Sequence, residues 1–250
     1  MPPLIMFDLD QTLAESKQPL APDMAERITA LLGQTKVAVI SGGALAQFLK
    51  QVVNQLSQEA NLSNLYLLPT SGAQLYEYKD RTWKNVYAES LTETEAAHVI
   101  SVLTEVAQTS GLIDFESPAW GERIENRGAQ ITLSALGQDA PIEDKKAWDP
   151  DKSKRKILQK LLAERLPEFA VGMGGSNSVD ITRKGIDKAY GIQKIAEHLG
   201  LRIPDMLYVG DQLETGGNDE AATRTPIKTH AVSNPEETKQ LIDQMLSYTH

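Results

Sequence analysis

The sequence predicts a mixed α/β fold, with a core built on a parallel sheet and an α+β unit inserted into it. Three observations lead to this prediction. Short apolar runs alternate with amphipathic helices before residue 70, paired strands and helices follow, and the alternation returns after residue 185. A chain of 250 residues is long enough for one large domain or two modest ones.

The first part of the chain predicts three strands separated by two helices. The strands are expected at residues 4–9, 36–40 and 65–69, which are short and almost entirely apolar. Residues 22–33 and about 43–58 carry apolar side chains at helical spacing. Strand–helix–strand repeats of this kind are typical of parallel strands joined by crossover helices.

The middle of the chain has a different pattern. Residues 73–83 predict a hairpin, and Thr92 and Glu95 have the spacing of a helix capping box. The other elements expected here are strands at 122–127, 129–136, 168–173 and 177–182 and a helix at 151–166.

The last part of the chain returns to the first pattern, with a helix at 187–199, strands at 206–209 and 227–232, and a helix from 234. We therefore expect a discontinuous core domain, 1–83 with 186–250, and an inserted cap domain, 84–185.

Composition excludes several function classes. The chain has 34 acidic and 25 basic residues and a formal charge of −9, which argues against nonspecific binding to nucleic acid or to an anionic membrane. The absence of cysteine excludes disulfides, thiol catalysis and zinc–thiolate sites. No apolar window approaches a membrane span and no secretory signal is visible, so we expect a cytoplasmic protein.

Two aspartates, Asp8 and Asp10, end the first predicted strand, and Thr12 follows them. A loop at the carboxyl end of a strand can turn both carboxylates into one crevice, where they repel each other unless they share a cation or a proton. One carboxylate can attack phosphorus and the other can carry protons. Taken alone, this pair is more often a solvated acidic turn.

Residues after three later elements can complete such a site. Ser41 and Gly42 follow the second strand, where a hydroxyl and free N–H groups can bind phosphate, although a simple helix cap is an equally good explanation. Asp211 and Asp219 lie in a glycine-rich loop after a late strand and could supply oxygen ligands for Mg²⁺.

A lysine between Asp8 and a phosphoryl group would offset the repulsion of their negative charges. Lys184 and Lys188 both precede the late strand, and the residue pattern does not choose between them.

These residues, in this order, resemble the four-motif signature of the haloacid dehalogenase (HAD) superfamily. The resemblance covers the whole chain and implies a Rossmann-like parallel-sheet core with an inserted α+β cap of type C2B. This cap type belongs to Cof-like sugar phosphatases, sucrose- and trehalose-phosphate phosphatases and eukaryotic-type phosphomannomutases. The last motif, Gly210-Asp211 followed by Gly216-Gly217-Asn218-Asp219, is most similar to that of the phosphomannomutases, as are the segments at 124–127, 174–180 and 185–188.

The resemblance implies a role for each residue. Asp8 would be the nucleophile and Asp10 the general acid/base, while Lys188, rather than Lys184, would be the motif lysine. The other implied roles are phosphoryl binding by Thr12, Ser41 and Gly42, metal binding by Asp8, the Asp10 carbonyl, Asp211, Asn218 and Asp219, and sugar-phosphate binding by Arg127 and Asp180.

Three positions depart from the mutase pattern. Gln138 and Lys145 stand where that family has arginines for a second phosphate, and an uncharged glutamine does not replace an arginine. Arg123 could compensate from a neighbouring position. In addition, Gln11 replaces the usual glycine between Asp10 and Thr12.

The leading hypothesis is a Mg²⁺-dependent phosphatase for a small phosphorylated sugar or related metabolite, and the alternative is a phosphohexomutase. A phospho-accepting receiver domain is disfavoured, because it would have neither the inserted cap nor a need for an acid/base such as Asp10 two residues after its nucleophile. An inactive binding module and an ATP-driven pump are disfavoured by the intact core motifs and the lack of membrane spans. We expect no nucleic-acid or membrane partner, and either a monomer or a cap-mediated homodimer.

Overall fold

The computed structural model describes residues 1–247 and consists of two compact units. The first unit contains Met1–Ala88 and the chain from Asp187 onward, and the second is Glu89–Ile186. The first boundary lies later than the sequence predicts, because the second strand of the predicted hairpin continues to Ala88 as part of the core sheet. No helix among the described residues is long and apolar enough to span a membrane.

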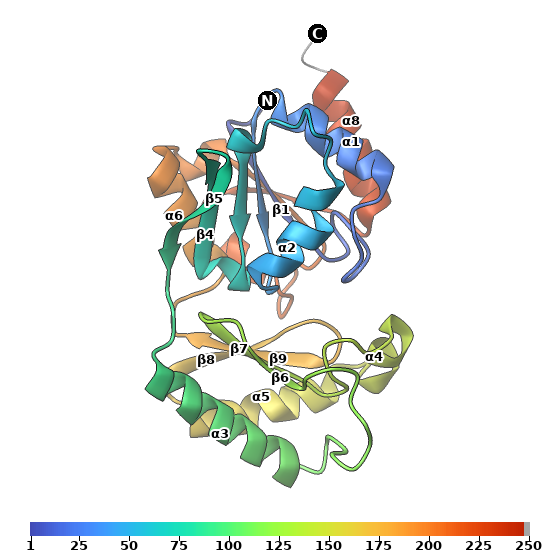
Figure 1. Ribbon diagram of the computed structural model, residues 1–250, viewed down its shortest axis with the longest axis vertical. Coiled ribbons are helices and arrows are strands. Elements are labelled where there is room, and N and C mark those ends of the chain that lie inside the picture. Colours follow the sequence, from blue (N-terminus) through green and yellow to red (C-terminus); the bar gives the residue numbers. More distant parts are fainter. Residues whose placement is uncertain (248–250) are drawn as a thin grey trace. The chain divides into compact units, whose positions relative to one another are not determined.

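The first unit is built on a seven-stranded sheet with the order β11-β10-β1-β2-β3-β4-β5 (Figure 1). Strands β11 to β3 in this order are parallel, and the hairpin β4–β5 adds two antiparallel strands. This arrangement confirms the predicted α/β class. The strands are β1 (Leu4–Asp8), β2 (Lys36–Ile40), β3 (Leu65–Leu68), β4 (Gln74–Lys79), β5 (Thr82–Ala88), β10 (Leu207–Gly210) and β11 (Lys228–Ala231).

Both faces of this sheet are buried, which explains why its central strands are continuous apolar runs. Alternate β1 residues serve the two sides: Phe7 packs in one hydrophobic cluster, and Met6 packs in the other. The first cluster includes α1 (Pro22–Leu32), α2 (Leu45–Gln51) and α8 (Pro235–Ser247), and the second includes α6 (Lys188–Leu199) and α7 (Glu220–Thr223).

The second unit has a four-stranded antiparallel sheet with the order β6-β7-β9-β8. One face of this sheet packs with the helices through apolar residues, among them Ile131 and Ile181. The alternate residues on β7 and β9, including Thr132 and Asp180, are polar. The elements are β6 (Ile124–Asn126), β7 (Gln130–Ser134), β8 (Phe169–Met173), β9 (Ser178–Arg183), α3 (Glu93–Thr109), α4 (Ile142–Trp148) and α5 (Ser153–Arg165).

Helix α3 begins as its sequence predicts. Thr92 Oγ1 accepts from the Glu95 N–H, and the Glu95 carboxylate accepts from the Thr92 N–H, which together form the capping box.

Three helices differ from the prediction. Helix α2 begins at Leu45 and ends at Gln51, well inside the expected span of 43–58, because glycine at 43 disfavours a helical start and β-branched valines follow Gln51. Helices α4 and α7 were not predicted, because both are short and neither has an extended apolar stripe.

The amino end of α6 is seated by a close approach of two glycines. Gly72 has a φ of +91°, and a Cβ atom placed on it would lie 2.8 Å from the Cα atom of Gly191. The residue at position 72 must therefore adopt a left-handed conformation and also lack a side chain. Since Lys188 is the first residue of α6, this contact helps to set the position of Lys188.

Replacing Gly72 with alanine should cost considerably more stability than replacing Gly200, which ends α6 with a φ of +64° and has open space around it. Gly200→Ala should lower the free energy of unfolding by about 1–2 kcal/mol from backbone strain alone. Gly72→Ala should cost about 1–3 kcal/mol more, because α6 and the turn between β3 and β4 must move apart. Urea unfolding measures both, and equal losses would contradict the proposed close-packing constraint.

Candidate active site

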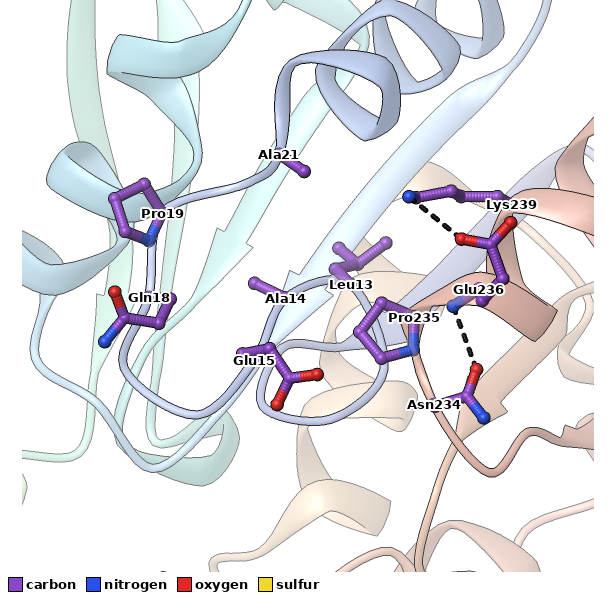
Figure 2. Close-up of a pocket in the computed structure, with 10 residues that line it drawn as sticks. All are labelled: Leu13, Ala14, Glu15, Gln18, Pro19, Ala21, Asn234, Pro235, Glu236 and Lys239. Carbon is purple, nitrogen blue, oxygen red and sulfur yellow. Dashed lines mark hydrogen bonds and ion pairs between the residues drawn. The ribbon is translucent and has the colours of Figure 1, made fainter. Parts of the chain in front are cut away.

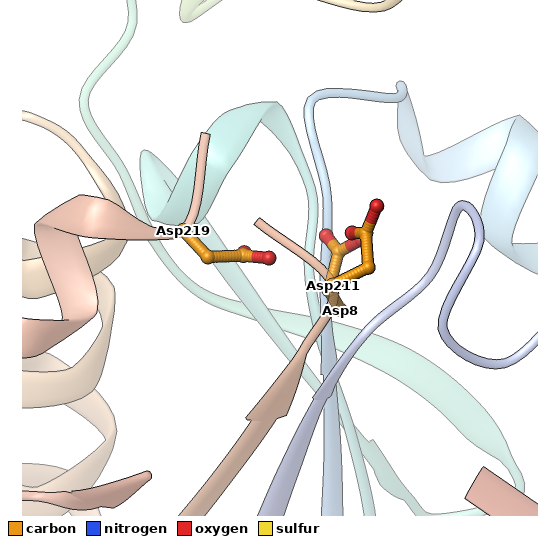
Figure 3. A group of neighbouring side chains, drawn as sticks. All are labelled: Asp8, Asp211 and Asp219. Atoms are coloured by element: carbon orange, nitrogen blue, oxygen red, sulfur yellow. The ribbon is translucent and has the colours of Figure 1, made fainter. Parts of the chain in front are cut away.

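Three carboxylates converge at the carboxyl ends of adjacent strands. Asp8 is the last residue of β1, Asp211 directly follows the neighbouring β10, and Asp219 lies at the end of the loop that continues from β10. One oxygen from each lies within 4.8 Å of the others. Figure 3 shows the Asp219 side chain extending from its loop towards the other two. The parallel sheet thus brings together residues that are far apart in the sequence.

Lys188 joins two of these carboxylates. Its ammonium donates to Asp8 Oδ1 at 2.5 Å and to Asp219 Oδ1 at 2.5 Å, and the lysine is only 3% exposed. The Asp187 side chain caps α6 by accepting from the N–H groups of Ala189 and Tyr190, so Lys188 starts from a fixed helix end. Lys184 is exposed, and the structure therefore brings Lys188 to the site.

Asp219 has hydrogen-bond donors on both of its oxygens. Besides Lys188, Oδ1 accepts from the hydroxyl of Tyr208 at 2.5 Å, and Oδ2 accepts from the Gln212 N–H at 3.1 Å. This carboxylate is fully buried. It is better suited to hold Lys188 than to be a direct metal ligand, the role that the resemblance implies for it. The sequence analysis missed Tyr208, because an aromatic residue inside an apolar strand is indistinguishable from ordinary core.

The charges of the site do not balance without another cation. Burial raises the pKa of Asp8 well above its usual range, against the opposing effect of the Lys188 ammonium. Burial and the nearby Asp219 charge raise the pKa of Asp211 to about 6. Burial also favours a higher pKa for Asp219, but the Lys188 charge and its hydrogen bonds outweigh this and lower that pKa. One ammonium therefore compensates only part of the negative charge.

The unpartnered oxygens of the site fit a divalent cation. Among the described residues, Asp8 Oδ2 and Asp211 Oδ1 are buried and accept no hydrogen bond. Leaving buried carboxylate oxygens unpaired is costly, whereas two carboxylates are a usual protein contribution to a Mg²⁺ site. Asp8 and Asp211 could therefore hold the ion. Asn218 is exposed in the glycine-rich loop, in keeping with a supporting position rather than a buried one.

The turn that carries Asp10 is held by backbone contacts. Asp10 Oδ1 accepts from the Lys17 N–H at 2.6 Å, and the Gln11 N–H donates to the Ala14 carbonyl at 2.7 Å. Gln11 has a φ of +62°, the left-handed conformation that favours glycine. Glycine adopts this conformation without strain, which explains why it is the usual residue here and why Gln11 is unusual. Thr12 is fully buried in the same turn, and no residue of the described chain bonds its hydroxyl.

Ser41 follows β2 and is 4% exposed. It is not the cap of α2, because Ala44 occupies that position. The Ser41 hydroxyl accepts only a long contact of 3.5 Å from the Gly43 N–H, across Gly42. Ser41 also holds the next strand end, since its carbonyl accepts from the Ser71 N–H at 2.9 Å. The helix-cap explanation for Ser41 is thus wrong.

A pocket of about 380 Å³ lies beside the turn that carries Asp10 (Figure 2). It is lined by residues between 13 and 21 and by the start of α8, where Lys239 is paired with Glu236. None of the residues that line this pocket belongs to the cluster of Asp8, Asp211 and Asp219.

The second unit holds the predicted sugar-phosphate residues. The Arg127 guanidinium donates to Glu125 Oε2 at 2.6 and 2.9 Å and to Gln138 Oε1 at 3.3 Å. Lys145 is buried, and its ammonium donates to the Gln138 carbonyl at 2.8 Å. The three positions that the mutase resemblance assigns to a second phosphate therefore do lie together, with Glu125 offsetting part of the positive charge.

Asp180 lies on the polar face of the same sheet, where its Oδ1 accepts from Thr132 Oγ1 at 2.8 Å. Arg123 is used differently from the prediction. Its guanidinium donates to the carbonyls of Asp114, Ser117 and Ala135 and stacks on Phe115 at 4.8 Å. These contacts make Arg123 a brace for a loop, and the expected compensation for Gln138 is not supported.

Comparisons with known proteins point to one family. A family model described as eukaryotic phosphomannomutase matches residues 24–248. A phosphomannomutase of Encephalitozoon cuniculi is 26% identical over 256 residues, which cover 97% of this chain and 93% of the relative. Phosphomannomutase 1 of Homo sapiens is 23% identical over 243 residues, which cover 95% of this chain and 89% of the relative.

Solved structures show the same fold. The IMP-nucleotidase of Plasmodium falciparum matches with a TM-score of 0.68 and 17% identity over 98% of this chain and 68% of that one. A haloacid dehalogenase-like hydrolase from Bacteroides thetaiotaomicron matches with a TM-score of 0.65 and 15% identity over 98% and 100%. At these identities the likeness concerns the fold alone. With the family model spanning most of its length, the chain belongs to the eukaryotic phosphomannomutase family and is a phosphoryl-transfer enzyme.

Proposed function

We propose that this protein, with bound Mg²⁺, takes one phosphoryl group of a hexose bisphosphate onto Asp8, which leaves a hexose monophosphate, and returns the group to the free hydroxyl of a hexose monophosphate. It would thus interconvert hexose 1- and 6-phosphates. The observation that carries this proposal is the environment of Asp8, which has one oxygen on Lys188 and the other buried and unpaired within residues 1–247. The family membership supports the mutase over the phosphatase that the sequence analysis put first.

The residues around Asp8 account for the first step. An Asp8 oxygen forms a bond to phosphorus while the bond between phosphorus and the sugar oxygen breaks. Asp10, in its acid form, gives a proton to the departing oxygen. The Lys188 ammonium, with the Ser41 and Thr12 hydroxyls, would stabilise the charge on the transferring group.

The second step uses the same groups in reverse. Asp10, now a carboxylate, takes the proton of the attacking hydroxyl as that oxygen bonds to phosphorus, and the bond to Asp8 breaks. Mg²⁺ bound by Asp8 and Asp211 would neutralise negative charge at the phosphoryl group. We further propose that the second unit acts as a cap, with Arg127 and Asp180 recognising the rest of the sugar phosphate.

Hydrolysis is a second candidate, and the residue at 138 favours it. Gln138 is uncharged and Arg127 is already paired with Glu125, so the cap offers less positive charge for the second phosphate of a bisphosphate intermediate. If water then replaces the sugar hydroxyl as the acceptor of the phosphoryl group on Asp8, free phosphate forms instead of the isomeric sugar phosphate.

Phosphorus NMR separates the two outcomes. The protein is incubated with Mg²⁺, mannose 1-phosphate and a trace of hexose 1,6-bisphosphate. Appearance of the 6-phosphate would support the mutase, and growth of free phosphate alone would support the phosphatase. No change with either mannose or glucose 1-phosphate would contradict both as hexose-phosphate activities.

Asp8→Asn should abolish turnover and leave the fold intact, because an isosteric amide cannot form the acyl phosphate. Asp10→Ala should still allow phosphorylation of Asp8 but slow its resolution by about 10²- to 10⁴-fold, the usual contribution of a general acid or base. Rapid-quench detection of phosphorylated protein and a steady-state rate measure both. Normal turnover by Asp8→Asn would sink the nucleophile assignment.

Mg²⁺ should stabilise the protein more at pH 7.5 than at pH 5. The pKa of Asp211 is about 6 when folded, above the 3.8 of a free aspartate, so its carboxylate costs stability as pH rises through this range. A cation removes that cost only when the group is ionised. Thermal unfolding with and without Mg²⁺ tests this. Asp211→Asn should lose most of the Mg²⁺-dependent increase at pH 7.5, and an unchanged increase would contradict the metal site.

Gln138→Arg should raise the affinity for a hexose bisphosphate by about ten- to a hundredfold, as expected for one added charged hydrogen-bonding pair. The ratio of isomerisation to phosphate release should rise with it. Gln138→Met, which is similar in size and uncharged, serves as the control and should not raise either quantity. Equal behaviour of the two variants would show that position 138 does not contact the second phosphate.

A further inference from the structure

Tyr208 is a buried tyrosine in the middle of β10 that the proposed mechanism does not use. We infer that it is a positioning residue, which holds Asp219 and, through Asp219, fixes the Lys188 ammonium against Asp8. The inference rests on the proposed role of Lys188 in phosphoryl transfer. It adds a residue to that site which neither the sequence motifs nor the family comparison identifies.

The geometry links these residues in one chain of contacts. The Tyr208 hydroxyl donates to Asp219 Oδ1 at 2.5 Å, and Lys188 donates to the same oxygen at 2.5 Å and to Asp8 Oδ1 at 2.5 Å. Tyr208 and Asp219 are both 0% exposed. In this buried setting each hydrogen bond to a charged group is strong, and loss of one partner is costly.

Tyr208 supplies rigidity that the Asp219 segment lacks. Asp219 ends a loop with two consecutive glycines, Gly216 and Gly217. The Asp219 N–H donates to the Gln212 carbonyl at 3.0 Å, and its Oδ2 accepts from the Gln212 N–H at 3.1 Å. Tyr208 instead lies in a strand that pairs with β1 on one side and β11 on the other. The Tyr208 hydroxyl is therefore a donor held by a strand inside the sheet, and it sets the direction of the Asp219 carboxylate.

The hydroxyl also limits how far Asp219 can draw Lys188 towards itself. Two carboxylates compete for one ammonium, and the phenol occupies part of the acceptor capacity of Asp219 Oδ1. Without this hydroxyl, Oδ1 of Asp219 has lost a fixed donor, and the carboxylate can turn about its Gln212 contact and draw Lys188 away from Asp8. The phosphoryl group would then meet a displaced ammonium, and transition-state stabilisation would fall.

A second tyrosine offers a matched control. Tyr66, on β3, belongs to the same hydrophobic cluster as Tyr208 and is 6% exposed, but it has no contact with the site residues among the interactions of the described chain. Tyr208→Phe and Tyr66→Phe each remove one hydroxyl and keep the ring that fills the core. A purely structural role of Tyr208 predicts at most a loss of stability, with kcat unchanged in both variants.

Kinetics of the two variants test the inference. Tyr208→Phe should lower kcat about tenfold with KM changed less than twofold, while Tyr66→Phe should leave both within twofold. The effect of Tyr208→Phe should also disappear in an Asp219→Asn background, since the hydroxyl acts through that carboxylate. Retention of full kcat by Tyr208→Phe, or an equal additional loss in the Asp219→Asn background, would overturn the positioning role.

Chemical labelling of Lys188 needs no substrate and separates this inference from the proposed function. Acetic anhydride followed by peptide mass spectrometry should label Lys188 several-fold more in Tyr208→Phe than in the parent protein or in Tyr66→Phe. Equal labelling in all three proteins would contradict the positioning of Lys188 by Tyr208. Increased labelling together with a failed phosphorylation of Asp8 would retain the contact and reject the proposed function.

Discussion

The ammonium of Lys188, buried between Asp8 and Asp219, is the interaction on which the site depends. Three carboxylates within 4.8 Å of one another would repel strongly in a buried environment, and a single positive charge makes their approach tolerable only in part. Burial, together with the neighbouring carboxylate charges, raises the pKa values of Asp8 and Asp211. The remaining imbalance of charge gives a physical reason for a divalent cation, since the two unpaired oxygens of the described site belong to these same residues.

Strand pairing and one close helix contact bring the residues of the site together. Parallel pairing of β1 with β10 places Asp8 and Asp211 at one edge of the sheet, and the approach of Gly72 to Gly191 seats the helix that begins with Lys188. The second unit presents a polar sheet face on β7 and β9. Arg127, between β6 and β7, and Lys145, on α4, are held by Glu125 and Gln138. In the proposed function the core supports phosphoryl transfer, while residues of the second unit determine whether a sugar hydroxyl or water receives the phosphoryl group.

The sequence predicted those parts of the molecule that local patterns specify. Asp8 and Asp211 could be found because they lie at strand ends, whereas only the family resemblance distinguished Lys188 from Lys184. Tyr208 could not be predicted, because its hydroxyl contacts Asp219 only once the loop after β10 has folded. The role predicted for Arg123 is not supported for the same reason. Its closeness to Arg127 in the sequence does not indicate that the Arg123 guanidinium binds three backbone carbonyls. The early end of α2 likewise depends on packing with residues near Leu20 and Gln18.

The central claim is that Asp8 carries the transferred phosphoryl group. It is tested most directly by mixing the protein with Mg²⁺ and a hexose 1,6-bisphosphate, quenching within milliseconds in acid, and locating phosphate by peptide mass spectrometry. The account predicts an added phosphoryl group on the peptide that contains Asp8, at that residue, and on no other carboxylate. Phosphorylation of a different residue, or turnover of the substrate with no phosphorylated protein in the millisecond range, would contradict it.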